Sequence, residues 1–471
     1  MKIIMLGGNT KEEIERRLRI VASAGSLSRS EGTVTDVYES KSDYQKNLKL
    51  AQAVVGYGHR SISEHDYIVL ALENVTPIIE QTLIEYRLTS FTIKSRRNVD
   101  FRNVGFYTPR FRDKEEGVLK DSNILKVVYQ NHMKQLFNKY GELVDEELPV
   151  EDCRYILPYS YYSNIIMGCD ANELFRITCD LLYGKLSNIS EAKELGMKFE
   201  NIIRENIPYL SKALDNEKEK NYYNDKLGFL DEKVKYEDKL LKKAKLIDYD
   251  IFADDKVLSS ILMNRYQLSA DKADKVLEDL YKDDPEVKNK MIKALIQSKN
   301  QRELEQVSYT FELPISLAVL THITRHRMHS LLVPDFTPIW NLDNYVIPDT
   351  IKEKHEKEYK EIFRDNKNTM EYFKEQGVRD EDLVYFYLSV NACNIQTTMN
   401  ARTLEWISRM RTCKKAQWEI RHLVEDMVEQ VKFWNPLIGT ALGPTCEIEG
   451  YCPEGKDSCK QRGVVVKQKK K

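Results

Sequence analysis

Residues 300–332 read "NQRELEQVSYTFELPISLAVLTHITRHRMHSLL", and this stretch decides the fold of the half of the chain that contains it. Its residues 306–313 predict a β-strand, and the apolar residues that follow predict a helix that ends near Arg327. The stretch also places three of the chain's eight histidines and two arginines within residues 322–329. A strand, a helix and a cluster of basic side chains therefore follow one another here.

A second stretch, residues 57–91, repeats this pattern as "YGHRSISEHDYIVLALENVTPIIEQTLIEYRLTSF". It predicts a strand at residues 67–75 and a helix that ends near Arg87. Earlier in each half, "MKIIML" and "AKLIDYDIF" predict a strand that is followed by helical sequence. Thr10 and Glu13 have the spacing of a capping box for the first of these helices. The order strand, helix, helix, strand, helix therefore occurs twice.

The later parts of the two halves also match. "CRYILPYSYYSNIIMGCDANELFRI" parallels "VYFYLSVNACNIQTTMNARTLEWI", each being an apolar segment, a polar turn and an amphipathic helix. We predict an α/β (α+β) fold of two tandem, helix-rich domains, each with a β-sheet, that form a pseudo-dimer. The first repeat spans residues 1–215, a charged linker 216–239, the second repeat 240–445, and a cysteine-containing basic tail 446–471. Two unrelated α/β domains with the same order of elements would also fit this order alone.

Composition indicates a globular protein that has no general affinity for nucleic acid or membranes. Of the 471 residues, 42% are hydrophobic and 31% charged, and the formal net charge is −2. No stretch approaches the roughly 18 apolar residues of a membrane-spanning helix, and the first residues do not resemble a signal peptide. The eight cysteines form no disulfide framework. We therefore expect a cytoplasmic protein without nucleic-acid or membrane partners.

Three motifs of the second half carry a family resemblance. They are Arg325-His326-Arg327, the segment "NARTL" at residues 400–404 and the segment "AQWEI" at residues 416–420. In this combination they resemble the flavin-dependent thymidylate synthases of the ThyX type. The resemblance implies reductive methylation of dUMP to dTMP, with FAD as cofactor, methylenetetrahydrofolate as one-carbon donor and NADPH as reductant. It also implies a folate- and dUMP-binding enzyme that needs no catalytic thiolate.

Each half retains motif residues that the other has lost. The family's Ser-x-Arg pair is present in the first repeat as Ser95 and Arg97, whereas the second repeat has Asp335 and Thr337. In exchange, Glu85-Tyr86 stands in the first repeat where the second has Arg325-His326. Likewise, an arginine that precedes a Leu-Pro in the family is Arg154 in the first repeat and Tyr385 in the second. We therefore predict one complete site built from both repeats, a decayed reciprocal site, and a homodimer that carries one flavin per chain.

The resemblance assigns roles to individual residues. Arg411 is the expected catalytic residue, because a fixed guanidinium can stabilise negative charge on the N3–O4 edge of uracil. The expected substrate-binding residues are Ser95, Arg96, Arg97, Arg154, His322 and Arg325. The expected cofactor-binding residues are His59, Ser61, Arg325, His326, Arg327, Asn400 and Arg402. The basic cluster would thus face the phosphates of a flavin and a nucleotide.

Other interpretations of these motifs stay open. The segment "KSRR" at residues 94–97 could be an exposed basic turn, and a metal could be held by three tail cysteines, Cys446, Cys452 and Cys459. The three histidines at 322, 326 and 329 have the i, i+4, i+7 spacing of one helix face, but two flanking arginines disfavour zinc there, and we predict no metal. Alternative functions are a related flavoprotein that acts on another pyrimidine nucleotide, or a non-catalytic protein that binds nucleotides or flavin.

Overall fold

The chain folds as two compact units. The computed structural model describes residues 1–218, 228–230, 233–234, 239–298, 300–337 and 339–459. Unit 1 comprises Met1–Glu237, Phe336–Leu342 and Ile347–Val390, and unit 2 comprises Asp238–Asp335, Asp343–Val346 and Asn391–Lys471. Residues 219–227, 231–232 and 235–238 of the predicted linker, and residues 460–471 of the predicted tail, lie outside the described residues.

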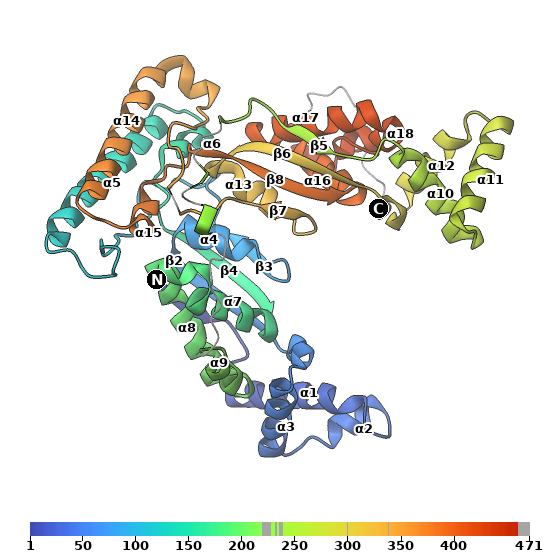
Figure 1. Ribbon diagram of the computed structural model, residues 1–471, viewed down its shortest axis with the longest axis horizontal. Coiled ribbons are helices and arrows are strands. Elements are labelled where there is room, and N and C mark those ends of the chain that lie inside the picture. The colour runs from blue at the N-terminus through green and yellow to red at the C-terminus, as the bar shows by residue number, and fades with distance from the viewer. Residues whose placement is uncertain (219–227, 231–232, 235–238, 299, 338, 460–471) are drawn as a thin grey trace. The chain divides into compact units, whose positions relative to one another are not determined.

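Unit 1 is built on a four-stranded antiparallel sheet (Figure 1). The strands lie in the order β1 (Lys2–Met5), β2 (Tyr67–Val75), β4 (Ser163–Asp170), β3 (Ser90–Ile93). Alternate side chains of β2 are buried, as expected for a strand with one face on the core. The predicted strand at residues 67–75 is confirmed, and so is the capping box of Thr10 and Glu13.

The helices of unit 1 come from both parts of the chain. Those before residue 219 are α1 (Lys11–Leu27), α2 (Val34–Glu39), α3 (Tyr44–Gly56), α4 (Pro77–Ile84), α5 (Ser122–Asp145), α6 (Val150–Cys153), α7 (Ala171–Tyr183), α8 (Ser190–Asn206) and α9 (Ser211–Lys218). Two later helices, α14 (Asp349–Glu375) and α15 (Asp380–Leu383), also belong to this unit. Residues that we assign to the second sequence repeat therefore complete the core of unit 1.

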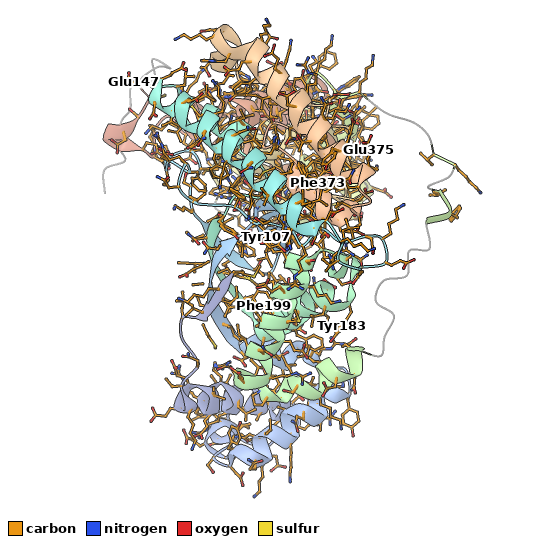
Figure 2. All side chains as sticks on the ribbon, turned by 90° about the vertical axis from the view of Figure 1, so that its left-hand side faces the viewer. Tyr107, Glu147, Tyr183, Phe199, Phe373 and Glu375 are labelled. Carbon is orange, nitrogen blue, oxygen red and sulfur yellow. The ribbon has the colours of Figure 1, made fainter. Side chains whose placement is uncertain are left out.

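Helices α5 and α14 run side by side in unit 1 (Figures 1 and 2). His132 of α5 contacts Asn366 of α14, with 2.8 Å between Nε2 and Oδ1. Further along, Lys139 Nζ lies 2.6 Å from an oxygen of Glu358. The partner numbers fall as the α5 numbers rise, so the two helices are antiparallel. Near the end of α14, the ring of Phe373 lies 4.9 Å from that of Phe111, which precedes α5.

Unit 2 repeats the sheet of unit 1, in the order β5 (Lys245–Asp248), β6 (Ser308–Ser316), β8 (Ala392–Asn400), β7 (Ser330–Leu332). Its helices are α10 (Ala253–Tyr266), α11 (Ala270–Asp283), α12 (Val287–Gln297), α13 (Leu317–Thr324), α16 (Ala401–Arg411), α17 (Trp418–Trp434), α18 (Pro436–Gly439) and α19 (Thr445–Ile448). The predicted fold class, a helix-rich α/β chain with one sheet in each half, is confirmed. None of the described helices combines the length and apolarity that crossing a membrane would need.

The structure differs from the predicted elements in detail. Strand β6 extends past the predicted end at residue 313 and includes Pro314, which is tolerated because β5 pairs with β6 only as far as Glu312. Helices α4 and α13 end three residues before the predicted Arg87 and Arg327. Three helices rather than two precede each long strand. The short strands β3 and β7 were not predicted, because three or four residues carry too little periodicity.

Candidate active site

The Arg-His-Arg segment lies in unit 2, in the connection between α13 and β7. Helix α13 ends at Thr324, and the backbone N–H groups of Arg325 and His326 both donate to the carbonyl of Ile323. Arg325 and Arg327 are exposed, whereas His326 is half-buried. The tight turn therefore presents two cations on either side of a partly covered imidazole.

Arg411 joins this turn from α16, of which it is the last residue. Its Nε donates to Nε2 of His326 over 2.9 Å, and its Nη2 donates to the carbonyl of His322, also over 2.9 Å. Two hydrogen bonds from different nitrogens fix the plane of the guanidinium. The structure thus brings Arg411 to His322 and His326, although Arg411 lies 85 residues after His326 in the sequence.

His326 is neutral in this arrangement. Burial, together with the charge of Arg411 and smaller contributions from His329 and Arg325, lowers the pKa of His326 to about 3. Because Nε2 accepts the hydrogen bond from Arg411, the ring proton of the neutral imidazole is on Nδ1. His326 can therefore offer one N–H donor without adding a charge to the cations around it.

The three clustered histidines do not share one helix face. Helix α13 ends before His326, and His329 is buried beside β8, where its Nδ1 lies 2.6 Å from Oγ1 of Thr397. The i, i+4, i+7 spacing therefore has no helical counterpart in the structure. Among the residues that the structure describes, no group of three or more His, Cys, Asp or Glu side chains is placed to hold a metal ion.

Asn400 and Arg402 lie at the opposite end of α16 from Arg411. The Oδ1 of Asn400 caps the helix by accepting from the backbone N–H of Thr403 over 2.8 Å. Arg402 forms an ion pair with Glu305, with 2.5 Å between Nη1 and Oε1. At 1.5 Å per residue, Asn400 is roughly 16 Å from Arg411 along the helix. These two predicted cofactor-binding residues are thus separate from the Arg411 cluster.

In unit 1 the predicted phosphate clamp follows β3, and its arginines have different partners. Arg96 is buried, and its Nη1 lies 2.6 and 2.8 Å from the two carboxylate oxygens of Glu80 in α4. The structure therefore places Arg96 in a buried ion pair, whereas we expected it at the substrate phosphate. Arg97 is partly exposed and its Nε donates to Glu151 over 2.6 Å, while its backbone N–H donates to Ser95 Oγ over 3.3 Å.

Arg154 is a second buried cation in this region, and it differs from Arg96 in its hydrogen-bond partners. Only 2% of its surface is exposed, and its Nε donates to the backbone carbonyl of Glu151 over 3.1 Å. Its Nη2 has no hydrogen-bond partner, and none of the described carboxylates forms an ion pair with it. Burial, reinforced by the like charge of Arg96, lowers the pKa of Arg154. A buried guanidinium whose Nη2 has no acceptor among the described residues is costly for a protein alone and suits an anionic ligand.

His59 and Ser61 are exposed at the start of the 3-10 helix Arg60–His65, which leads into β2. The neighbouring Arg60 donates to Glu217 over 3.1 Å and lies over the ring of Phe175. The structure therefore shows His59 and Ser61 on an open surface of unit 1 that Arg60 anchors to the rest of the unit. Their predicted role in cofactor binding stays a prediction.

The second-repeat counterpart of Arg154 is Tyr385, which also lies in unit 1. Tyr385 is buried there, and its hydroxyl donates to Glu191 over 3.2 Å. Glu191 also accepts from the backbone N–H and hydroxyl of Thr76, at the start of α4, over 2.9 and 2.7 Å. The hydroxyl of Tyr385 therefore has a hydrogen-bond acceptor within unit 1, in contrast to Nη2 of Arg154.

The sequence interpretation missed three acidic partners: Glu80, Glu151 and Glu191. Glu80 carries a usable signal, because it is an acidic residue within the otherwise apolar segment "PIIEQTLI" and so calls for a buried cation. Glu151 lies three residues before Arg154, a spacing that places both on one face of a helical turn. Glu191 carries no such signal, because its partners Thr76 and Tyr385 are distant in the sequence.

The basic turn of unit 2 fits a flavin dinucleotide in the chemistry of its donors. The cofactor carries two phosphate groups, and Arg325 and Arg327 supply exposed guanidinium groups with several N–H donors each. His326 supplies an N–H donor from a neutral ring. Because these donors come from one short segment, a single extended anion could contact all of them.

Comparisons with known proteins cover most of the chain. The model of the family "Thymidylate synthase complementing protein" matches residues 12–209 and 245–437. A flavin-dependent thymidylate synthase from Clostridium tetani is 33% identical over 216 residues, which cover 41% of this chain and 85% of that protein. Another from Thermococcus kodakarensis is 33% identical over 165 residues, which cover 32% of this chain and 67% of that protein. The crystal structure of a UMP/dUMP methylase, PolB, from Streptomyces cacaoi bound with 5-Br dUMP aligns with a TM-score of 0.37 and 18% identity, covering 46% of this chain and 94% of that one.

Proposed function

This chain belongs to the thymidylate synthase complementing protein family, with two copies of the family domain in one polypeptide, and we propose that it converts dUMP to dTMP. Its relatives are flavin-dependent thymidylate synthases, and the chain is an enzyme of this methyltransferase class. The proposal includes methylenetetrahydrofolate as one-carbon donor, FAD as cofactor and NADPH as reductant. All of these are the substrates and cofactors that the sequence resemblance implies.

The observation that carries the proposal is Arg154. Its buried Nη2 has no partner among the described residues, so a nucleotide phosphate would supply the missing acceptor and the missing negative charge. Arg97 and Ser95 are close by, because Arg97 and Arg154 both contact Glu151. We assign the phosphate of dUMP to Arg154, with Arg97 and Ser95 as additional donors. Arg96 then acts indirectly, by holding this segment on Glu80.

Arg411 would act on the pyrimidine ring. Its guanidinium is fixed by His326 and by the carbonyl of His322, so little reorganisation is needed when negative charge develops on the N3–O4 edge of uracil. That charge makes C5 nucleophilic, as methylation requires. The neutral His326 supports this role, because it accepts a hydrogen bond from Arg411 without neutralising the guanidinium. His322 and Arg325 would contact the nucleotide from the same side.

The flavin would supply hydride transfer when it is bound. Arg325, His326 and Arg327 would hold its phosphates from the turn after α13. Asn400 and Arg402 would add contacts farther from Arg411, at the other end of α16. His59 and Ser61 of unit 1 would also contact the flavin, as the resemblance implies. The residues of the chain thus bind and orient the two anionic ligands, and no enzyme thiolate is needed.

Two parts of the sequence interpretation stay predictions here. One is that a single complete site combines residues of both repeats. The other is that the protein is a homodimer with one tightly held flavin per chain. Determination of the mass in solution, together with the amount of flavin released per chain, tests both. A monomer, or two flavins per chain, would contradict them.

The function is tested by product formation. The purified protein should be yellow, and incubation with dUMP, methylenetetrahydrofolate and NADPH should yield dTMP, detected by chromatography. Arg411→Ala is the matched variant, and it should retain flavin but form no dTMP. If the protein binds dUMP and flavin but forms no product from dUMP, the reaction proposed here is wrong. A product from a different pyrimidine nucleotide would favour the related flavoprotein, and no product at all would favour the non-catalytic alternative.

A further inference from the structure

The chain continues past the matched family region and packs on the last turn of α16. The family match ends at residue 437, and the structure describes the chain as far as residue 459. In the intervening part, the backbone N–H of Gly443 donates to Oγ of Ser408 over 3.1 Å. Nη1 of Arg409, the next residue of α16, donates to Oε1 of Glu449. We call residues 443–449 the C-terminal segment, and it holds two adjacent residues of the helix.

Arg409 is the main link between α16 and the C-terminal segment. Only 9% of its side chain is exposed, and its Nε donates to Oε1 of Glu405, one turn earlier in the helix. Two carboxylates, Glu405 from α16 and Glu449 from the C-terminal segment, therefore share one guanidinium. Charge-assisted hydrogen bonds from a planar guanidinium fix its orientation. Removal of either carboxylate would leave a largely buried charge with one partner fewer.

Arg411 is the last residue of α16, two positions after Arg409. At about 3.6 residues per turn, side chains two positions apart point to nearly opposite sides of a helix. Arg411 extends towards His326 and the carbonyl of His322. Arg409 extends away from them, towards Glu449. The last carbonyls of a helix lack intrahelical partners, so its last turn frays unless other groups hold it. Glu449 therefore acts, through Arg409, on the backbone that carries Arg411.

We infer that Glu449 positions Arg411 for the reaction by holding the last turn of α16. The inference rests on the proposed function, because it takes Arg411 as the residue that stabilises charge on the pyrimidine ring. Stabilisation of this kind depends on a guanidinium that is fixed before the charge develops. If the last turn moves, Arg411 loses its alignment with uracil, and a displacement of about 1 Å is enough to cost about 100-fold in rate. Glu449 is thus a positioning residue that lies outside the matched family region.

The experiment compares Glu449→Ala and Glu449→Gln with the wild type in dTMP formation by the full chain. Glu449→Ala should lower kcat by about 10- to 100-fold, with KM for dUMP little changed, because the phosphate contacts assigned to Arg154 are in unit 1. Glu449→Gln should restore part of kcat, since its amide oxygen still accepts from Arg409. The matched control is Glu454→Ala, which removes an ion pair with Lys415 from the same end of the chain. That pair is 3.7 Å long and its side chains are 42% and 52% exposed, so its loss should leave kcat unchanged.

A second readout follows Arg411 without turnover. The Nε2 resonance of His326, assigned by its loss in His326→Gln, reports the hydrogen bond from Arg411 in the ligand-free protein. It should shift in Glu449→Ala and stay in place in Glu454→Ala, and circular dichroism should show both variants folded. Glu449→Gln, which keeps an acceptor, provides both readouts if Glu449→Ala does not fold.

Three results would overturn the inference: an unchanged kcat in Glu449→Ala, a loss of kcat without a shift of the His326 resonance, or an equal loss in Glu454→Ala. A wild type that forms no dTMP would instead refute the proposed function. In that case the His326 resonance still shows whether Glu449 holds Arg411 in place, and no shift in Glu449→Ala would overturn the inference as well.

Discussion

Replacing Arg154 with methionine should stabilise the ligand-free protein and weaken nucleotide binding. In the structure the side chain is buried, and its Nη2 has no acceptor among the residues that are described. A buried donor without a partner costs about 1–3 kcal/mol, and a charge without a counter-ion adds to that cost. The substitution also removes the hydrogen bond from Nε to the carbonyl of Glu151, which offsets about 1.5–3 kcal/mol. These two contributions roughly cancel, so the removal of the buried charge decides the sign. We expect the free energy of unfolding to rise by at most about 2 kcal/mol, since methionine fills the site without polar atoms.

The neighbouring Arg96 provides a control with the opposite sign. It is also buried, but it is paired with Glu80 through both carboxylate oxygens. Arg96→Met would leave Glu80 as an uncompensated buried carboxylate, which costs about 3–5 kcal/mol. Two substitutions of the same chemistry, in adjacent parts of unit 1, should therefore move the stability in opposite directions.

Chemical denaturation followed by circular dichroism gives the two free energies, and calorimetric titration gives the affinity for dUMP. Loss of charge-assisted hydrogen bonds from Arg154 to a phosphate should weaken dUMP by about 10- to 150-fold. If Arg154→Met destabilises the protein as much as Arg96→Met does, Arg154 has a structural role. If dUMP affinity is unchanged, Arg154 does not hold the phosphate.

Three further predictions concern other polar contacts. Burial raises the pKa of Glu191 from 4.5 to about 7, so the stability that its protonated form contributes is complete below about pH 4.5 and lost by about pH 7. The free energy of unfolding should therefore fall by about 3 kcal/mol between about pH 4.5 and pH 7 in the wild type. Chemical denaturation across this range should show no such fall in Glu191→Gln. Arg411→Met should raise the pKa of His326, because it removes a nearby cation, and an NMR titration that shows no rise would contradict the hydrogen bond between them. Ser95→Ala combined with Arg97→Ala should weaken dUMP in calorimetry but leave flavin binding unchanged; a loss of flavin from this variant would contradict the separate roles.

The sequence predicted the elements whose pattern is local. Residues 67–75 alternate between buried and exposed positions as a strand should, and Thr10 with Glu13 needs only a spacing of three residues. The sequence did not predict that α14, which belongs to the second repeat, packs in the core of unit 1. The two repeats have similar patterns, so periodicity alone does not distinguish packing on the parent repeat from packing on its neighbour. That choice depends on side-chain contacts such as His132 with Asn366.

For the candidate site, too, the sequence predicted the residues of the local motifs but not their tertiary partners. The motifs placed Arg325, His326 and Arg411 near one another in function, and the structure brings His326 and Arg411 into contact. The motifs could not show that Arg96 is paired with Glu80, whereas Arg154 forms no ion pair with a carboxylate in the described part of the chain. Both are arginines in basic or apolar surroundings, and only the tertiary structure shows which one has a partner.

Both units have a hydrogen bond between the segment that follows one helix and the last turn of a second helix, but the donor and acceptor are exchanged between the units. In unit 2 the second residue after α13, His326, accepts from Arg411 in the last turn of α16 over 2.9 Å. In unit 1 the second residue after α4, Tyr86, donates to Asp180 in the last turn of α7 over 2.7 Å. Either arrangement connects the segment to the helix by a hydrogen bond, so the cation Arg411 in unit 2 can correspond to the carboxylate Asp180 in unit 1. A phosphate that approached the unit 1 position would meet the charge of Asp180, and like charges in a partly desolvated site oppose binding by several kcal/mol. The carboxylate in unit 1 is in line with one flavin per chain, and this ratio stays a prediction.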